Sequence, residues 1–85
     1  MLKIEISEHR EERVTVSLEG RLVGPWVGEV LRACTPYLDD RNGLTLDFTG
    51  VSFVDRDGVA LCRRLRRSRA RLRNCSPFVK EQIDG

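Results

Sequence analysis

The first part of the chain alternates apolar and polar residues, in 2–7 and again in 13–19. A period of two predicts strands that bury one face, and the charged stretch 9–12 between them predicts the turn of an antiparallel hairpin. Gly20 and Gly24 are expected to break the second strand. The inward-facing side chains are predicted to be Leu2, Ile4, Ile6, Val14, Val16 and Leu18.

A helical pattern follows the hairpin. Pro25 suits the first turn of a helix, where its missing N–H is not needed, and the apolar residues after it recur at three- and four-residue intervals. Pro36 predicts that this helix kinks or ends near Thr35, and residues 39–43 predict a loop that closes with an Asn-Gly turn pair. The predicted apolar face comprises Trp26, Val27, Val30, Leu31, Cys34 and Leu38.

The second half of the chain repeats this succession of strand and helix. Residues 44–49 predict a third strand that ends at Gly50, followed by a short apolar connection, 51–54, and a flexible polar loop, 55–58. A second helix and a fourth strand, within 70–75, come next. Their inward side chains are predicted to be Val59, Leu61, Cys62 and Leu65 on the helix and Ala70, Leu72 and Asn74 on the strand.

A serine–proline pair predicts the start of a last helix. Ser76 is the expected N-cap, Pro77 the first helical residue, and Phe78, Val79 and Ile83 the apolar face. The order β-β-α-β-α-β-α predicts an α/β fold, a four-stranded mixed β-sheet with the helices on one face. The uncovered face would carry Lys3, Glu5, Thr15, Ser17, Thr45 and Asp47.

Length and composition indicate one soluble domain, 1–85, because 85 residues leave no room for a second core. No apolar run approaches the roughly 18 residues of a membrane span, and Met1–Ser7 lacks the apolar centre of a signal peptide. We therefore expect a cytoplasmic protein with no direct membrane insertion. The three cysteines lack paired spacing and His9 is the only histidine, which predicts free thiols and neither a metal nor a cofactor.

Charge is unevenly distributed along the chain. Residues 1–60 carry a net charge of −4 and residues 61–85 a net charge of +6, with seven arginines within 63–73. The arginines can be a solvated basic face, protection for an open sheet edge, or a contact for an acidic protein surface or a phosphate backbone. Nucleic acid is the less favoured ligand, because aromatic content is only 6%. Three arginines alternate along the predicted fourth strand and would share one sheet face: Arg69, Arg71 and Arg73.

Three motifs together resemble the STAS family, the domains of anti-sigma-factor antagonists. In residues 44–59 a strand leads through an apolar connection to Asp55-Arg56-Asp57-Gly58 and then to a helix, similar to the family's Asp-Ser-Ser/Thr-Gly signature. Residues 18–22 resemble its Gly-Glu-Leu-Asp segment, and residues 75–79 resemble its Ser-Pro-x-Val helix start. The motifs occur in the family's order and spacing across nearly the whole chain.

The resemblance implies a non-enzymatic regulatory protein-interaction module of the bacterial cytoplasm. The implied partner is another protein, such as an anti-sigma factor or serine kinase that regulates transcription. An accessory subunit of a transport or membrane-associated complex is the alternative, and an open sheet edge also allows a homodimer. The residues expected to contact the partner are Asp55, Arg56, Asp57, Gly58, Val59, Arg21 and Trp26.

Three departures from the family pattern change this expectation. Arg56, which cannot accept phosphate, stands where sigma-regulatory members carry their phosphorylatable serine, and Asp57 stands where serine or threonine is usual. Val23 replaces an acidic residue of the kinase-contacting loop, and the chain reaches Gly85 without the family's final strand and helix, which predicts a fold shortened at the C-terminus. We therefore expect no serine switch, with Ser52 and Thr49 as the remaining candidate phosphoacceptors.

Each candidate residue also has a simpler interpretation. The carboxylate of Asp57 can stabilise the helix N-terminus or stand as a fixed charge where relatives place phosphate. Arg56 can be solvated or can bind a partner carboxylate, and Trp26 and Tyr37 can be core residues or, for Trp26, an interface anchor. The Asp55/Asp57 pair has no second carboxylate cluster or histidine nearby, so no catalytic or metal site is expected.

Overall fold

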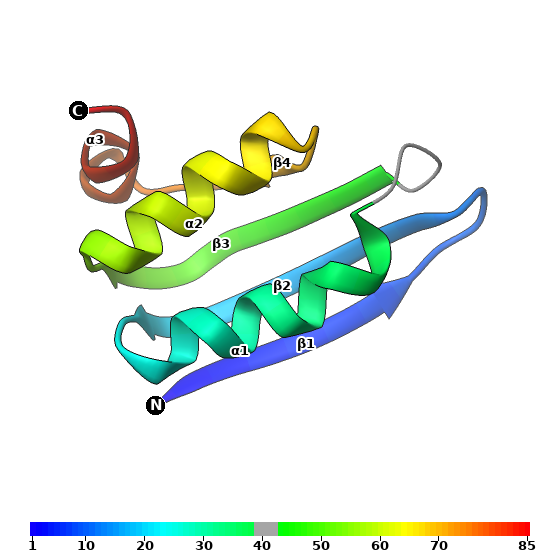
Figure 1. The fold of residues 1–85 in the computed structure, drawn as a ribbon, viewed down its shortest axis with the longest axis horizontal. Helices are drawn as coiled ribbons and strands as arrows, with labels where there is room; N and C mark the ends of the chain where they lie inside the picture. The colour runs from blue at the N-terminus through cyan, green and yellow to red at the C-terminus, as the bar shows by residue number, and fades with distance from the viewer. Residues whose placement is uncertain (39–42) are drawn as a thin grey trace.

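The computed structural model describes residues 1–38 and 43–85, and Figure 1 shows its path. Its elements confirm the predicted order of strands and helices, with one short 3-10 turn added. They are β1 (Leu2–Glu8), β2 (Arg13–Leu22), α1 (Pro25–Cys34), η1 (Thr35–Tyr37), β3 (Gly43–Val54), α2 (Arg56–Arg67), β4 (Arg71–Arg73) and α3 (Pro77–Asp84).

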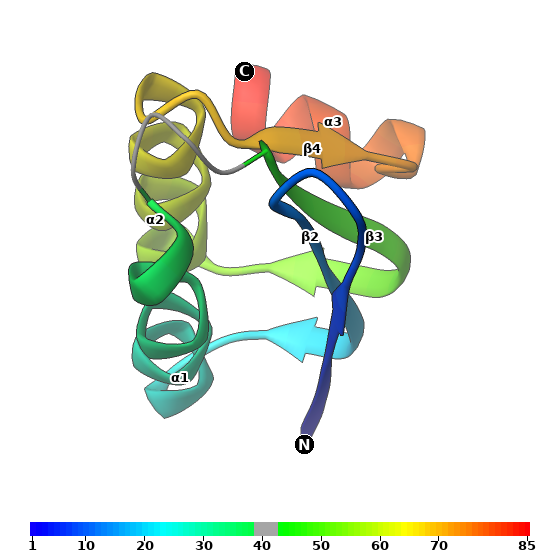
Figure 2. The same ribbon diagram turned by 90° about the vertical axis from the view of Figure 1, so that its right-hand side faces the viewer.

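The sheet has four strands in the order β1-β2-β3-β4. The β1–β2 hairpin is antiparallel, and β2–β3 and β3–β4 are parallel pairs connected through α1 and α2. Figure 2 shows α1 and α2 together on one side of the sheet, which confirms the predicted α/β arrangement. α3 lies beside the sheet, where the amide of Gln82 bonds the backbone N and O of Val54 at 3.1 and 2.8 Å. α3 thus covers backbone groups of β3 that β4 is too short to pair.

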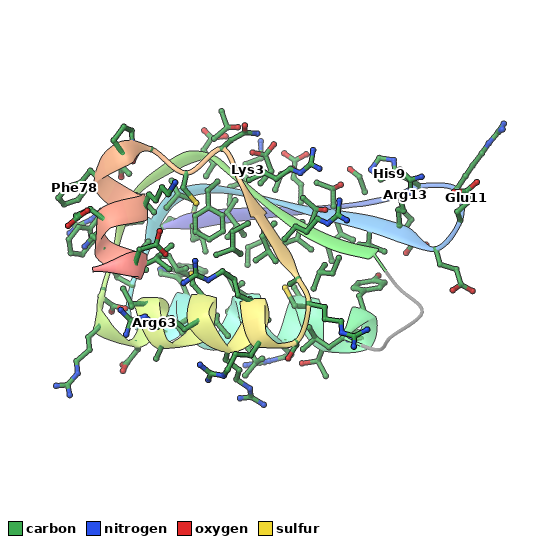
Figure 3. The ribbon with its side chains drawn as sticks, turned by 90° about the horizontal axis from the view of Figure 1, so that it is seen from above. Lys3, His9, Glu11, Arg13, Arg63 and Phe78 are labelled. Atoms are coloured by element: carbon green, nitrogen blue, oxygen red, sulfur yellow. The ribbon has the colours of Figure 1, made fainter. Side chains whose placement is uncertain are left out.

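The core lies between the sheet and the helices, and most of its residues follow the predicted alternation. The inward residues of β2 and the first half of β3 are buried, as are Val30 and Cys34 of α1. Ile6 is the exception in the hairpin, because it is 46% exposed. Its neighbour across the hairpin, Val16, is buried, but β1 is the outer strand and the hairpin end extends beyond the helices (Figure 3).

Two strands are longer than predicted. β2 continues through Gly20 to Leu22, and β3 continues through Gly50 to Val54, so neither glycine ends a strand. The ladder between them shifts register between Ser17 and Glu19 and again after Gly20. Glycine suits such irregularities because it adopts positive φ at little cost, and Gly20 has φ 119° with the backbone of Met1 close by. The predicted apolar connection after Gly50 is therefore strand.

The ends of α1 follow the sequence signals. Pro25 is its first residue, and α1 gives way at Thr35 to η1, which contains Pro36. The predicted end near Thr35 is confirmed. The Leu31 carbonyl accepts from Thr35 N and also, at 2.7 Å, from the Thr35 hydroxyl. The loop predicted for 39–43 lies outside the described residues except for Gly43, the first residue of β3.

The C-terminal elements differ from the prediction in two details. β4 has only three residues, because Arg69 and Asn74 adopt φ 70° and 62° on either side of it. Asn74 is exposed rather than inward. Ser76 caps α3 as predicted, its hydroxyl accepting from Val79 N at 3.1 Å, but Phe78 is 57% exposed and not part of the buried face.

Candidate partner-binding site at the start of α2

Asp55 joins two loops at the carboxyl ends of β2 and β3. Its Oδ1 accepts from Gly58 N at 2.8 Å, so Asp55 is the N-cap of α2. Its Oδ2 accepts from Gly24 N at 2.9 Å, 31 residues earlier in the sequence. The predicted polar loop 55–58 is therefore wrong as a flexible segment, because Arg56, Asp57 and Gly58 form the first turn of α2. The surface that they create is a rigid helix start.

Gly58 is buried in this turn. A side-chain carbon built on it would lie 2.6 Å from Val54 Cγ1 and 2.9 Å from the Leu22 carbonyl oxygen. Glycine is therefore required because the helix start packs directly on the ends of β2 and β3. The surface that approaches Gly58 closely belongs to this chain, so its neighbours in sequence must provide any contact with a partner.

Arg56 and Asp57 are the exposed residues of the turn. No hydrogen bond or ion pair within 1–38 and 43–85 involves either side chain. Asp57 lies in the first turn of α2, where its negative charge is attracted by the positive end of the helix. The cation of Arg56, in the same turn, is repelled by that end. Val59 and Trp26 are each half-buried against the core. The Gly24–Asp55 bond places the entry to α1, which carries Trp26 in its first turn, next to the start of α2.

Arg21 lies in a different contact from the Asp55 cap. Its guanidinium carbon is 5.1 Å from the centre of the Phe53 ring, and Phe53 stacks on Phe78 with ring centres 6.3 Å apart. The sequence prediction did not include this ring contact, because it placed Phe53 in an apolar connection and Phe78 on the buried face of the last helix. The parallel register that places Arg21 opposite Phe53 depends on the bulges in β2 and was not readable from the alternation alone.

The cysteines of the described chain are thiols at neutral pH, and its other polar groups form no cluster of metal ligands. Burial raises the pKa of Cys34 to about 11 and that of Cys62 to about 12, and it also raises the pKa of Cys75. Thiols at neutral pH are weak nucleophiles. Within the described part of the chain, no group of three or more His, Cys, Asp or Glu is placed to hold a metal ion. None of the described helices is both long and apolar enough for a membrane span.

Comparison with known proteins identifies solved structures of the same shape. No family model and no curated protein sequence matches the chain. The unphosphorylated anti-sigma factor antagonist SpoIIAA is similar at a TM-score of 0.77 and 21% identity, over 95% of this chain and 81% of the other. The phosphorylated form of SpoIIAA, the Bacillus cell fate determinant, is similar at a TM-score of 0.74 and 20% identity, over 95% of this chain and 80% of the other.

A third solved structure extends the comparison to another organism. The STAS domain of an antisigma-factor antagonist from Rhodobacter sphaeroides gives a TM-score of 0.65 and 13% identity, over 92% of this chain and 95% of that one. At such identities the likeness establishes the fold. The chain therefore has a STAS-like fold, the α/β architecture of these anti-sigma factor antagonist structures.

Proposed function

We propose that this protein is a non-enzymatic regulatory module that binds another protein through the start of α2. The observation that carries the proposal is the Asp55 carboxylate, which accepts hydrogen bonds from both Gly24 N and Gly58 N. These bonds hold the α1 and α2 entry loops in one fixed arrangement. A preorganised surface loses little conformational entropy on binding. Arg56 and Asp57 extend from it as an exposed charge pair, with Val59, Trp26 and Arg21 as further contacts.

The likeness to anti-sigma factor antagonists supports the choice of partner. We propose an anti-sigma factor or serine kinase as the bound protein, in the cytoplasm of a bacterium. Arg56 presents a planar donor group that can form two parallel hydrogen bonds with a carboxylate. Asp57 requires a complementary basic or N–H group, so the partner surface should carry both signs of charge.

We further propose that the contact surface keeps one charge state. SpoIIAA has been solved in phosphorylated and unphosphorylated forms, whereas Arg56 occupies the serine position of the signature in this chain and has no hydroxyl. Thr49 is a weak candidate for a displaced switch, because its hydroxyl donates to Asp47 Oδ1 at 2.6 Å. Ser52 is exposed on β3 and is the other hydroxyl to test.

Binding to a purified anti-sigma kinase from the same bacterium tests the proposal. By calorimetry, we expect Arg56→Ala and Asp57→Ala each to weaken binding about tenfold, the usual loss for a charged hydrogen bond. Arg67→Ala, at the other end of α2, is the matched control and should bind normally. Equal affinity of all variants, with the native fold retained, would refute the proposed contact surface.

The same kinase tests the absence of a switch. Incubation with ATP should leave residues 55–58 unmodified in the natural sequence, whereas Arg56→Ser should acquire phosphate at position 56, as peptide mass spectrometry would show. Phosphate on Ser52 in the natural sequence would instead mean that the switch has moved along β3. Calorimetry measures partner binding independently, so phosphorylation at position 56 or at Ser52 can be distinguished from a change in partner binding.

A further inference from the structure

A second surface feature lies at the opposite end of β2 and β3 from the start of α2. It is a hollow of about 620 Å³ on the sheet face that α1 and α2 leave uncovered, which we name the basic hollow. Figure 3 labels His9, Glu11 and Arg13 at the hairpin end, which forms one of its sides. Its charged lining is Arg10, Glu11, Arg13, Asp47, Arg71 and Arg73.

The β1–β2 hairpin end and β4 supply the guanidinium groups from opposite sides of the hollow. Arg10 and Arg13 come from the hairpin end, whereas Arg71 and Arg73 come from β4. Arg71 pairs with Thr45 and Arg73 with Asp47 in the parallel ladder, so the two arginines point to the same face as those residues. The prediction that alternating arginines share one face is confirmed for this pair. A ligand in the hollow would meet cationic groups on both sides.

The basic hollow has a surplus of positive charge. Its two carboxylates have partners already: Glu11 pairs with Arg13 at 3.2 Å, and Asp47 Oδ1 accepts from Thr49 N, from the Thr49 hydroxyl and from the Asn74 amide. These bonds lower the pKa of Asp47, so its charge is satisfied within the sheet. Within the described chain, Arg71 and Arg73 pair with no carboxylate. Their donors remain available to a ligand.

We propose that the basic hollow binds a small anion carrying several phosphate groups. Guanidinium groups form paired hydrogen bonds with phosphate oxygens, and the hydroxyl of Thr45 lines the same space as a further donor. The hollow has the size of a small-molecule site. Among the described residues that line the hollow, the His9 imidazole is the one aromatic ring, and there is no Phe, Trp or Tyr, so the ligand is bound mainly through its phosphates and not by base stacking. A nucleoside triphosphate and inorganic tripolyphosphate share this chemistry.

Calorimetric titration with inorganic tripolyphosphate, and separately with ATP, tests the proposal. At low salt both should bind with similar affinity, and both should bind more weakly near 0.15 M NaCl, because salt screens exposed charges. Arg71→Gln and Arg73→Gln should each weaken binding about tenfold. Arg64→Gln and Arg67→Gln remove the same charge from the exposed side of α2 and should leave binding unchanged. Glu11→Gln releases Arg13 and should strengthen binding.

Four results would overturn the proposal. They are no binding of tripolyphosphate at roughly 1 mM, binding of ATP without tripolyphosphate, equal losses from the two pairs of arginine variants, and tighter binding of a single-stranded oligonucleotide or an oligoglutamate peptide. The last two ligands would indicate a nucleic-acid or an acidic-protein contact. Arg56→Ala lies outside the hollow and should bind tripolyphosphate normally, so failure here is separable from failure of the proposed partner site.

Discussion

The Asp55 cap at the start of α2 and the basic hollow lie at opposite ends of β2 and β3 and use charge in opposite ways. At the start of α2, the Asp55 carboxylate is occupied by backbone N–H groups of its own chain, and a buried glycine packs on the strand ends. At the basic hollow, Arg71 and Arg73 have no carboxylate partner among the described residues. Charge that is internally bonded stabilises the fold, whereas charge without a partner is available for binding.

The largest effect should come from Gly58→Ala. Its methyl group would lie 2.6 Å from Val54 Cγ1 and 2.9 Å from backbone oxygen of Leu22, so the helix start must move away from the strands. We expect a loss of about 2–3 kcal/mol in the free energy of unfolding, measured by urea denaturation. Gly28→Ala is the matched control in α1, because its added methyl group would meet no atom within 4 Å apart from its own stretch of helix. It should be neutral or stabilising, by up to about 1 kcal/mol. Equal behaviour of the two variants would contradict the close packing.

Asp55→Ala should have the next largest effect. It removes the N-cap bond to Gly58 N and the bond to Gly24 N, so we expect about 2 kcal/mol of destabilisation. Urea denaturation measures the loss, and amide hydrogen exchange at Gly24 and Gly58 should accelerate. Arg71→Gln in the basic hollow should change stability little. A larger loss for Arg71→Gln than for Asp55→Ala would reverse the comparison between the two regions.

Arg56→Glu should stabilise the protein slightly. The change replaces a cation by an anion in the first turn of α2, next to the positive end of the helix. We expect a gain of about 0.3–1 kcal/mol in the free energy of unfolding, together with loss of partner binding. Thermal or urea denaturation at low salt would detect the gain. Unchanged or lower stability would mean that Arg56 makes a favourable contact that the geometry does not show.

The smallest effect concerns acid stability and Asp47. Hydrogen bonds from Thr49 and Asn74 hold the pKa of Asp47 below its ordinary value of 3.8. A carboxylate with a lowered pKa in the folded state contributes stability above its unfolded pKa and loses it as the pH falls below that value. Asp47→Asn should therefore be less sensitive to a fall from pH 5 to pH 3, as urea denaturation at both values would reveal. An identical pH dependence in both proteins would exclude this contribution.

Local signals were sufficient for most of the fold. The alternation in β1 and β2, Pro25 at the start of α1 and the Ser76 cap of α3 were all readable, because periodicity and capping involve residues close in sequence. The position of the candidate site could be predicted, since the signature that residues 55–58 resemble lies at the start of a helix. Its fixed conformation could not be predicted, because Asp55 bonds the distant Gly24 N as well as its neighbour Gly58 N.

The amino-acid sequence by itself thus determined the order of strands and helices, most of the inward side chains and the presence of Arg56 where the signature that it resembles has serine. Tertiary structure decided where the glycines act, which aromatic rings stay exposed and which charges meet. Gly58 packs on Leu22 and Val54, and Arg13 shares a hollow with Arg71 across 58 positions of sequence. Such contacts depend on strand register and helix docking, which arise only when distant segments bury their apolar faces together.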